Sequence, residues 1–398
     1  MGRWPAFNQP LPNELFSSWF ARLARANLCE PYFFAAYHWP GSWIWNIDCD
    51  LGVRSQIIDD LSTFTSLPKV LVQATFLHSF IGRYLTGINK NGYNQEILSV
   101  NTRALIRRNF GQQICPYCLK EDGVPYFRKQ WRLTAFTVCR RHEVKLLDRC
   151  SHCQASINPH LLPLGFDDLA FCWRCGSDYR LMPVHKVKSD AQILWFQDLL
   201  DQGLNEGWGL LNSDTKVSTP IFLDGIWRIV MPFLSRRKIN RMLPLMSKFL
   251  NIELDIPLLN RKMSRLNTLD VDLRFQAISL ASALIFKWPT VFLKFCSEFG
   301  LNQTSFFKTN GVAPYWLSCV LSWELNKKPY WVSDEEFVSA ILFLYKQNIV
   351  ISPGNVGEAL GLNRSMYITP FRKRILSIFQ EMQSKQKAAL HLRKFFHY

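Results

Sequence analysis

Four short motifs decide how the centre of this chain folds: C-P-Y-C at 115–118, C-R-R-H at 139–142, C-S-H-C at 150–153 and C-W-R-C at 172–175. In each motif two residues separate two side chains that bind metals, and a turn of this length directs both toward one point. Taken in order, the motifs predict two tetrahedral zinc sites in tandem. The ligands of the first are Cys115, Cys118, Cys139 and His142, and those of the second are Cys150, Cys153, Cys172 and Cys175.

This spacing favours zinc over a set of reduced or disulfide-bonded core cysteines, because seven of the eleven cysteines fall into it. His142 follows Cys139 at the distance typical of such a turn, whereas His152, inside the third motif, is a weaker rival as a ligand. Four protein ligands fill the tetrahedral shell of a zinc ion and leave no position for a substrate. Both sites are therefore predicted to be structural.

The composition indicates a folded, strongly basic protein. The chain has 398 residues, of which 48% are hydrophobic, and that is enough for two or three domains with their own cores. Its formal charge is +16, and seven thiolates with two zinc ions would lower it to +13. A charge of this size predicts an anionic partner, with nucleic acid as the first candidate.

Three features of the sequence indicate a protein that stays inside the cell. The first ten residues lack the apolar segment of a secretion signal. The longest apolar helical stretch, Phe275–Phe286, is too short to cross a bilayer, so no membrane partner is expected. Paired cysteine motifs that must stay reduced then indicate the bacterial cytoplasm.

The spacing of apolar residues predicts a mainly α fold in three parts. An N-terminal helical domain spans 1–105, a tandem zinc-ribbon or zinc-finger domain spans 106–185, and a C-terminal helical domain spans 186–398. In the first part, short helices at 12–27, 54–64 and 69–80 are separated by tight turns, which permits either a helix-turn-helix or an ordinary bundle. Asn13 is placed to cap the first of these helices.

The C-terminal part is predicted to hold its own helical motifs. A long helix over 270–287 is expected to end before Pro289, because proline cannot continue it. Further on, Ser333 and Glu336 have the spacing of a capping box at the start of a helix. The segment near 334–380 that follows is predicted to be helix-turn-helix-like.

Basic residues are concentrated around the zinc motifs, where 103–149 holds eleven Lys or Arg and four Asp or Glu. The segment Y-F-R-K-Q-W-R-L at 126–133 mixes aromatic and basic residues. We expect its aromatic residues to form the small core of the ribbon, and its basic residues either to contact nucleic acid or a protein or to be simply solvated. The candidate contacts are Arg128, Lys129, Arg132, Arg140 and Arg141, with Arg372, Lys373 and Arg374 in the C-terminal part.

Several motifs of common enzyme classes are missing from the sequence. No glycine precedes a lysine, so there is no Walker A loop, and H-E-x-x-H, H-x-E and G-x-S-x-G do not occur. A metal-dependent nuclease or transposase needs clustered carboxylates, which can come from distant parts of a sequence. An enzyme with such a scattered site therefore stays open as an alternative.

Three stretches resemble the TniQ/TnsD family of proteins that select target sites for transposition. The first is L-P-N-E-L-F-S-S-W-F-A-R-L at 11–23. The second is the zinc region, with its ribbon and the join C-R-R-H-E-V-K-L-L-D-R-C at 139–150. The third and looser one is R-F-Q-A-I-S-L-A-S-A-L-I-F-K-W-P-T-V-F at 274–292.

The resemblance implies a non-catalytic adaptor in a transposon that has a separate transposase and an AAA+ regulator, TnsC. TnsD-like members read an attachment site in DNA directly, whereas TniQ-like members can be held by an RNA-guided Cascade-type complex. Either kind passes the chosen site to TnsC. Trp19, Arg22 and Arg25 are the candidates for the contact with TnsC, and a homodimer is among the expected assemblies. The alternative function is a free-standing zinc-ribbon regulator that binds a specific DNA sequence, which a genome without neighbouring transposase and TnsC genes would favour.

Overall fold

A computed structural model describes most of the chain. The described residues are 2–89, 93–100, 110–187, 190–212, 215–235, 243–254, 266–306, 313–325, 333–347, 349–350, 352–361, 377–378 and 380–381. They form two compact units: Met1–Gly300 with Ser305–Lys308, and Leu301–Thr304 with Thr309–Tyr398. The structure is mainly helical and carries both cysteine clusters in its central region, as predicted.

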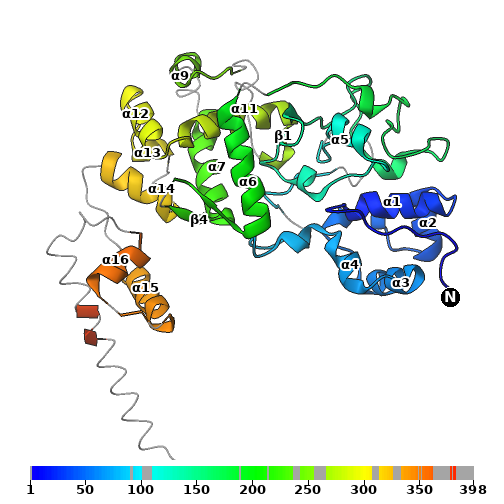
Figure 1. Ribbon diagram of the computed structural model, residues 1–398, viewed down its shortest axis with the longest axis horizontal. Coiled ribbons are helices and arrows are strands. Elements are labelled where there is room, and N and C mark those ends of the chain that lie inside the picture. Colours follow the sequence, from blue (N-terminus) through cyan, green and yellow to red (C-terminus); the bar gives the residue numbers. More distant parts are fainter. Residues whose placement is uncertain are drawn as a thin grey trace, which may run out of the picture. The chain divides into compact units, whose positions relative to one another are not determined.

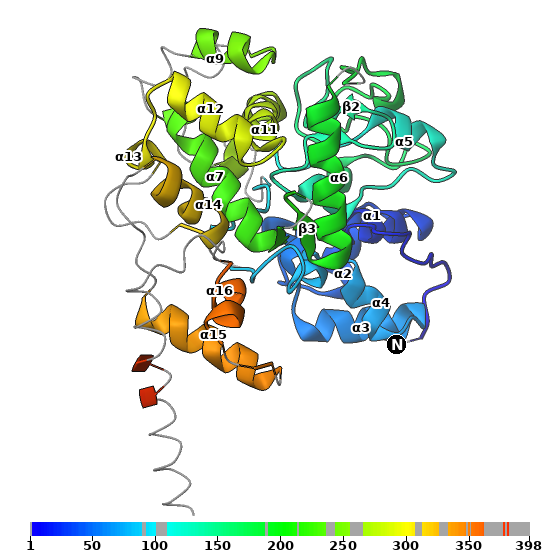
Figure 2. The same ribbon diagram turned by 60° about the vertical axis from the view of Figure 1, so that its left-hand side comes forward.

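The first unit begins with short helices that lie close together (Figures 1 and 2). They enclose an aromatic core. The helices are α1 (Phe16–Ala26), α2 (Pro31–His38), α3 (Ser55–Thr65) and α4 (Lys69–Ala74), with 3₁₀ turns at Ile44–Asn46, Cys49–Leu51 and Leu77–Phe80. The ring of Phe16 stacks on those of Phe20 and Phe76, with centroids 5.5 Å and 4.6 Å away. These rings belong to a core that also takes in residues of α2 and α3. The alternative between a helix-turn-helix and a plain bundle stays open here.

Two details of this part differ from the prediction. Asn13 does not cap α1, because its backbone is left-handed at φ 56° and the residue before the helix is Leu15. The helix predicted over 69–80 is interrupted after Ala74. There the hydroxyl of Thr75 donates to the carbonyl of Val72, and the carbonyl of Thr75 accepts from the amide of Phe16. Thr75 thus ends α4 by joining it to α1.

The zinc region has little regular structure. It contains α5 (Pro116–Glu121), a 3₁₀ turn at Lys129–Arg132, and the antiparallel strands β1 (Val138–Cys139) and β2 (Val144–Lys145). Further 3₁₀ turns lie at Pro159–Leu161 and Tyr179–Leu181. Tyr126, Phe127, Trp131 and Leu133 are all buried, which confirms that the aromatic residues of this segment form a small core.

A helical layer completes the first unit. It consists of α6 (Ala191–Glu206), α7 (Thr219–Ser235), α9 (Leu243–Leu250), α11 (Val271–Ile285) and α12 (Thr290–Glu298), with a hairpin of β3 (Trp208–Leu210) and β4 (Lys216–Ser218) and a 3₁₀ turn at Leu266–Thr268. Helices α6, α7 and α11 lie side by side (Figures 1 and 2). The carboxylate of Asp270 caps α11 by accepting from the amide of Leu273. As predicted, α11 ends before Pro289 and a new helix follows.

The second unit holds α14 (Tyr315–Val320), a π-helical turn at Leu321–Leu325, α15 (Asp334–Lys346) and α16 (Pro353–Ala359); α13 (Gln303–Phe306) lies at the division between the units. The capping box is confirmed: the Ser333 amide donates to Glu336, and the Glu336 amide donates to the Ser333 hydroxyl. Most of the last part of the predicted helix-turn-helix segment, 362–376, lies outside the described residues.

Within the described residues, no single helix is long and apolar enough to cross a membrane. Only α11 and α12 taken together, bent by 104° at their junction, meet the length and composition of a span. The two predicted domain boundaries, at 105/106 and 185/186, stay predictions. Hydrogen bonds nevertheless cross the one at 185/186, since the Val271 amide at the start of α11 donates to Asp148 in the zinc region.

Candidate metal centres and adaptor surface

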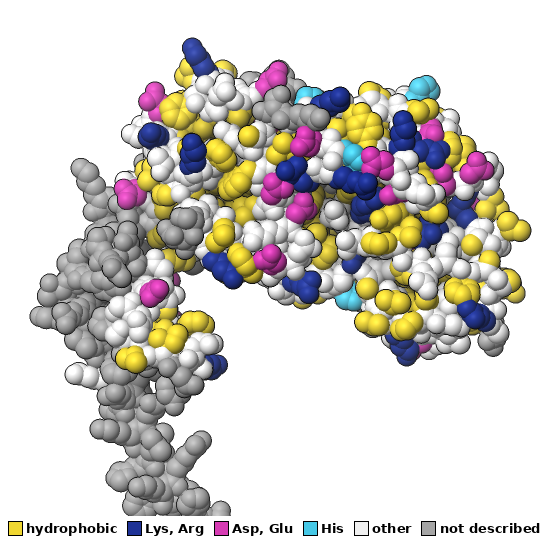
Figure 3. All heavy atoms as spheres, in the orientation of Figure 1, with side chains coloured by type: hydrophobic (Ala, Val, Ile, Leu, Met, Phe, Trp, Pro, Cys, Tyr) yellow, Lys and Arg dark blue, Asp and Glu magenta, His cyan; other side chains and the backbone are white. Residues whose placement is uncertain are grey.

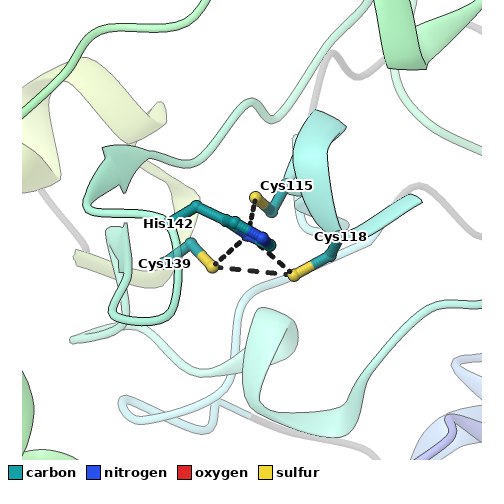
Figure 4. Close-up of side chains that lie close together, drawn as sticks. All are labelled: Cys115, Cys118, Cys139 and His142. Carbon is teal, nitrogen blue, oxygen red and sulfur yellow. Dashed lines mark hydrogen bonds between the residues drawn. The ribbon is translucent and has the colours of Figure 1, made fainter. Parts of the chain in front are cut away.

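The first cysteine cluster has the geometry of a tetrahedral metal site (Figure 4). Nδ1 of His142 lies 3.4 Å from the sulfurs of Cys115 and Cys118 and 3.5 Å from that of Cys139. The sulfurs of Cys118 and Cys139 are 3.6 Å apart. With usual Zn–S and Zn–N bond lengths, the edges of a zinc tetrahedron are about 3.8 Å between sulfurs and about 3.6 Å between sulfur and nitrogen. The four side chains therefore fit one zinc ion.

Two local structures position these ligands. Pro116 opens α5 directly after Cys115, and the first turn of that helix presents Cys118. Cys139 ends β1, and His142 follows in the turn that leads to β2. Glu121 lies behind the histidine, with its Oε2 3.0 Å from Nε2 of His142. A carboxylate in this position fixes the ring orientation and makes the ligating nitrogen more basic.

The second cluster, Cys150, Cys153, Cys172 and Cys175, has the same character. The sulfurs of Cys150 and Cys175 are 3.6 Å apart, as are those of Cys153 and Cys172. Burial raises the pKa of the Cys150 thiol to about 12, so a cation is needed to hold it as a thiolate at neutral pH. Cys175 is exposed, whereas the three cysteines of the first cluster are all buried. This cluster also fits a zinc ion, and it is the more accessible of the two.

Each cluster offers four protein ligands that enclose a single point. Zinc held in this way is closed to substrate and contributes to folding. His152, the rival ligand, is not part of the second cluster. The two predicted ligand sets are thus brought together as expected, and together they fit two structural zinc ions.

Two of the predicted basic contacts are inside the protein. Arg132 is 1% exposed and holds three partners: Asp48 at 2.6 Å, Asp50 at 2.5 Å and the carbonyl of Leu98 at 3.0 Å. We call Arg132, Asp48 and Asp50 the buried charge cluster. Lys129 is also buried, and its ammonium donates to the carbonyl of Ala74. Neither side chain can reach a phosphate, so the prediction of partner contacts is corrected to a structural role for both.

The remaining predicted basic residues vary in access. Arg128 is 12% exposed and is held by both oxygens of Asp122 and by the rings of Tyr126 and Trp131. Arg140 is partly exposed and bonds to Asp198, and Arg141 is largely exposed beside Glu121. Arg372, Lys373 and Arg374 lie outside the described residues. Figure 3 shows Lys and Arg interspersed with Asp and Glu on the face in view, not gathered into one field.

The N-terminal candidates are mostly buried as well. Trp19 is fully buried, and its indole donates to the carbonyl of Asn8. Arg22 forms a buried pair with both oxygens of Glu14. Arg25 is half-buried, with its guanidinium on the carbonyls of 162, 163 and 166. The direct contact with TnsC that we predicted for Trp19 and Arg22 is therefore corrected, because both side chains hold α1 to its surroundings.

A comparison with family models identifies the N-terminal part of the chain. Residues 5–146 match the model described as TniQ. The chain therefore contains a TniQ domain. No curated protein matches it.

The TniQ segment covers about a third of the chain and has defined structural limits. It includes the N-terminal helices, the buried charge cluster and the first zinc site, and it ends at Leu146 before the second site begins. TniQ proteins are non-catalytic adaptors of transposition that act in target selection, with DNA and the transposition machinery. The closed metal sites agree with that class of function, since they offer structure and not chemistry.

Sequence reasoning missed the acidic partners of the buried arginines. Glu14, at 1% exposure, accepts hydrogen bonds from Arg22 and from the hydroxyl of Ser18. A signal was present, because residues 14, 18 and 22 are spaced by four and would share one face of the helix predicted over 12–27, although in the structure Glu14 lies just before α1. Asp48 and Asp50 gave no comparable signal, since they are more than 80 residues from Arg132.

Proposed function

We propose that this TniQ protein links a chosen target DNA to the AAA+ regulator TnsC of a TnsABC-type transposon. The observation that carries the proposal is the TniQ match over 5–146, which covers a folded N-terminal part and a closed zinc site. The protein itself performs no chemistry and acts by holding partners. The protein recognises the target either by binding its DNA directly or by binding an RNA-guided Cascade-type complex. It acts in the bacterial cytoplasm, where its thiolates stay reduced.

Direct DNA contact would use the exposed cations of the zinc region. Lys120 follows the first motif, Arg141 lies inside the second and Arg174 inside the fourth, and all three are exposed. The turns that hold the metal also fix the backbone at these positions, so each cation is presented from a rigid base. Lys120 and Arg174 were not among the predicted contacts. Their positions in the sequence could have indicated this role, since Lys120 lies two residues after the ligand Cys118 and Arg174 lies between the ligands Cys172 and Cys175.

The test is binding by the purified, zinc-loaded protein. It is mixed with TnsC and with the guide complex, with and without an attachment-site duplex, at several salt concentrations. Binding to duplex alone with a steep salt dependence supports direct reading. Binding to the guide complex with no affinity for duplex supports the RNA-guided route. No binding to TnsC under any of these conditions would refute the adaptor function.

Charge reversal separates the two routes further. Arg141→Glu with Arg174→Glu should weaken duplex binding at least tenfold if the protein reads DNA directly, and should lower the salt slope by about 2 to 4, since the two cations are replaced by anions. Lys248→Glu with Lys294→Glu, at exposed positions on α9 and α12, changes the net charge by the same amount; it is the matched control and should change little. Equal effects of the two double variants would show that only net charge matters.

A further inference from the structure

A pocket in the N-terminal part is built without charged side chains. It lies between α2 and the loop that follows, and has a volume of about 180 Å³. Ala36 and Ala35 form part of it, together with the rings of Tyr32, Trp39, Trp43 and Trp45. None of its ten lining residues is charged, in a chain of formal charge +16. We call this site the aromatic pocket.

Two of its walls are fixed by hydrogen bonds. The indole of Trp39 donates to Asp60 at 2.8 Å, and that of Trp45 donates to the carbonyl of Pro31 at 2.9 Å. On its ring face Trp45 is stacked against His160, with centroids 4.5 Å apart and planes 9° from parallel. The walls are therefore in place before a ligand arrives, which reduces the entropy lost on binding.

The remaining aromatic residues are exposed around this pocket. Trp43 is 63% exposed and Tyr32 is 48% exposed. The backbone of Trp43 is left-handed, at φ 52° and ψ 35°, which is costly for a bulky residue and recurs at functional sites. Phe33 and Tyr37 of the same helix are exposed as well. Hydrophobic side chains accordingly gather on the surface over α1 to α4 (Figure 3). Exposed apolar patches of this kind commonly mark sites where a protein binds a partner.

Size and charge define the occupant. An apolar cavity of about 150 Å³ holds one benzene molecule, so this one has room for a single ring or branched side chain. A nucleotide would bring a phosphate, and no Lys or Arg lines the pocket to neutralise it. The ring faces would attract a cationic side chain, but it would find no carboxylate among the lining residues and would be repelled by a chain of formal charge +16. An uncharged ligand group is the one that matches.

We propose that the aromatic pocket receives one uncharged, ring-sized or branched side chain from a segment of a protein partner. Large apolar anchors in well-formed pockets supply much of the energy of protein interfaces, and the exposed rings of α2 would pack around the anchor. The inference rests on the proposed function in one respect, which is that an adaptor has protein partners. It adds the place where one of them is held.

The pocket is tested first with small probes and the full-length, zinc-loaded protein. N-acetyl-phenylalaninamide is titrated by saturation-transfer NMR and should bind with a Kd of about 1 mM. N-acetyl-argininamide and deoxyadenosine monophosphate should bind at least tenfold more weakly. Saturable binding is required. Its absence, or equal binding of either charged probe, would overturn the proposal.

Matched variants locate the binding. Ala36→Leu fills the pocket from an exposed position of α2 and keeps a good helix former there, so it should fold normally and weaken the probe at least tenfold. Leu28→Ala removes another exposed apolar side chain, 87% exposed and outside the pocket, and should leave binding unchanged. Unchanged binding by Ala36→Leu would place the probe elsewhere and refute the assignment.

The partner is tested with the same variants in the TnsC and guide-complex assays. Ala36→Leu should weaken at least one of these complexes tenfold, while Leu28→Ala should not. If wild-type protein binds its partners and Ala36→Leu binds equally well, the inference fails and the adaptor function stands. If wild-type protein binds neither partner, the adaptor function fails and, with it, the assignment of a partner protein. A wild-type dimer that Ala36→Leu converts to a monomer would assign the pocket to a second copy and overturn the choice of partner.

Discussion

Replacing Arg132 by methionine tests whether the buried charge cluster holds the N-terminal helices to the zinc region. Arg132 lies in the zinc region and is 1% exposed, while Asp48 and Asp50 belong to the N-terminal part and their side chains are 16% and 4% exposed. Asp50 also accepts from the amide and hydroxyl of Ser17 in α1. The cluster therefore joins three segments that are far apart in sequence.

The expected loss follows from burial. Removing one partner of a buried ion pair leaves the other charge uncompensated and costs about 3 to 5 kcal/mol. Arg132→Met should therefore lower the melting temperature of the protein by about 10 °C. Lys69→Ala is the control, because Lys69 and Asp59 form an ion pair with both side chains about half exposed, and such pairs contribute at most about 1 kcal/mol.

The pH dependence of this loss has a defined sign. Burial raises the pKa of Asp50, and the charge of Arg132 opposes that rise. Without Arg132 the pKa of Asp50 should rise further, so the folded protein keeps a proton that the unfolded chain releases. Stability is then lost as the pH rises above the pKa of the unfolded carboxyl, and the deficit of Arg132→Met should be larger at pH 7 than at pH 4.

The measurement is thermal and urea unfolding of wild type, Arg132→Met, Asp50→Asn and the double variant, each with its zinc content checked. The double variant should be more stable than the sum of the two single losses predicts, because it removes both charges of the Arg132–Asp50 pair. A loss for Arg132→Met no greater than that of Lys69→Ala, or strict additivity in the cycle, would contradict the reasoning.

Three further outcomes are expected. Metal analysis should find two zinc ions per chain, and Cys172→Ser should retain one of them. A competing chelator should first remove the ion held by the exposed Cys175. A single ion in wild-type protein would contradict the two-site assignment. Burial raises the pKa of Glu96 from 4.5 to about 7, so the unfolded chain releases a proton that the folded protein keeps. Glu96→Gln should then stabilise the protein by about 1 kcal/mol more at pH 8.5 than at pH 6 in unfolding titrations, and a constant difference would exclude this titration. Ser333→Ala should destabilise α15 by about 1 kcal/mol, seen as faster amide exchange in its first turn, because it removes the capping hydroxyl.

The sequence was informative wherever a pattern is local. The metal ligands are set by turns of four residues, and the capping box by residues three apart, so both could be read directly. The end of α11 could be predicted for the same reason, since proline acts on its own neighbourhood.

What could not be predicted depends on contacts between distant segments. Arg132 and Arg141 both lie in the basic segment around the zinc motifs, and nothing in the sequence distinguishes them. In the structure Arg132 is buried and Arg141 is exposed, because the fold places Asp48 and Asp50 against Arg132. The sequence wrongly predicts a contact surface at Trp19 and Arg22 for the same reason: periodicity identifies the faces of a helix but not what covers each face. The aromatic pocket left no sequence signal beyond a richness in rings.

Hydrogen bonds from α11 and from the 3₁₀ turn before it to residues earlier than 146 determine how this protein can be divided for laboratory work. The buried guanidinium of Arg274 donates to the side chain of Gln113 and to the carbonyl of Thr134, and the side chain of Asn267 donates to the carbonyl of Asn94. A fragment that ends at residue 146, where the family match ends, would leave Asn94, Gln113 and Thr134 without these hydrogen-bond partners. It would also lack the second metal site. An expression fragment that ends near residue 308 would keep every one of these bonds, and is the shortest we would choose for crystallisation.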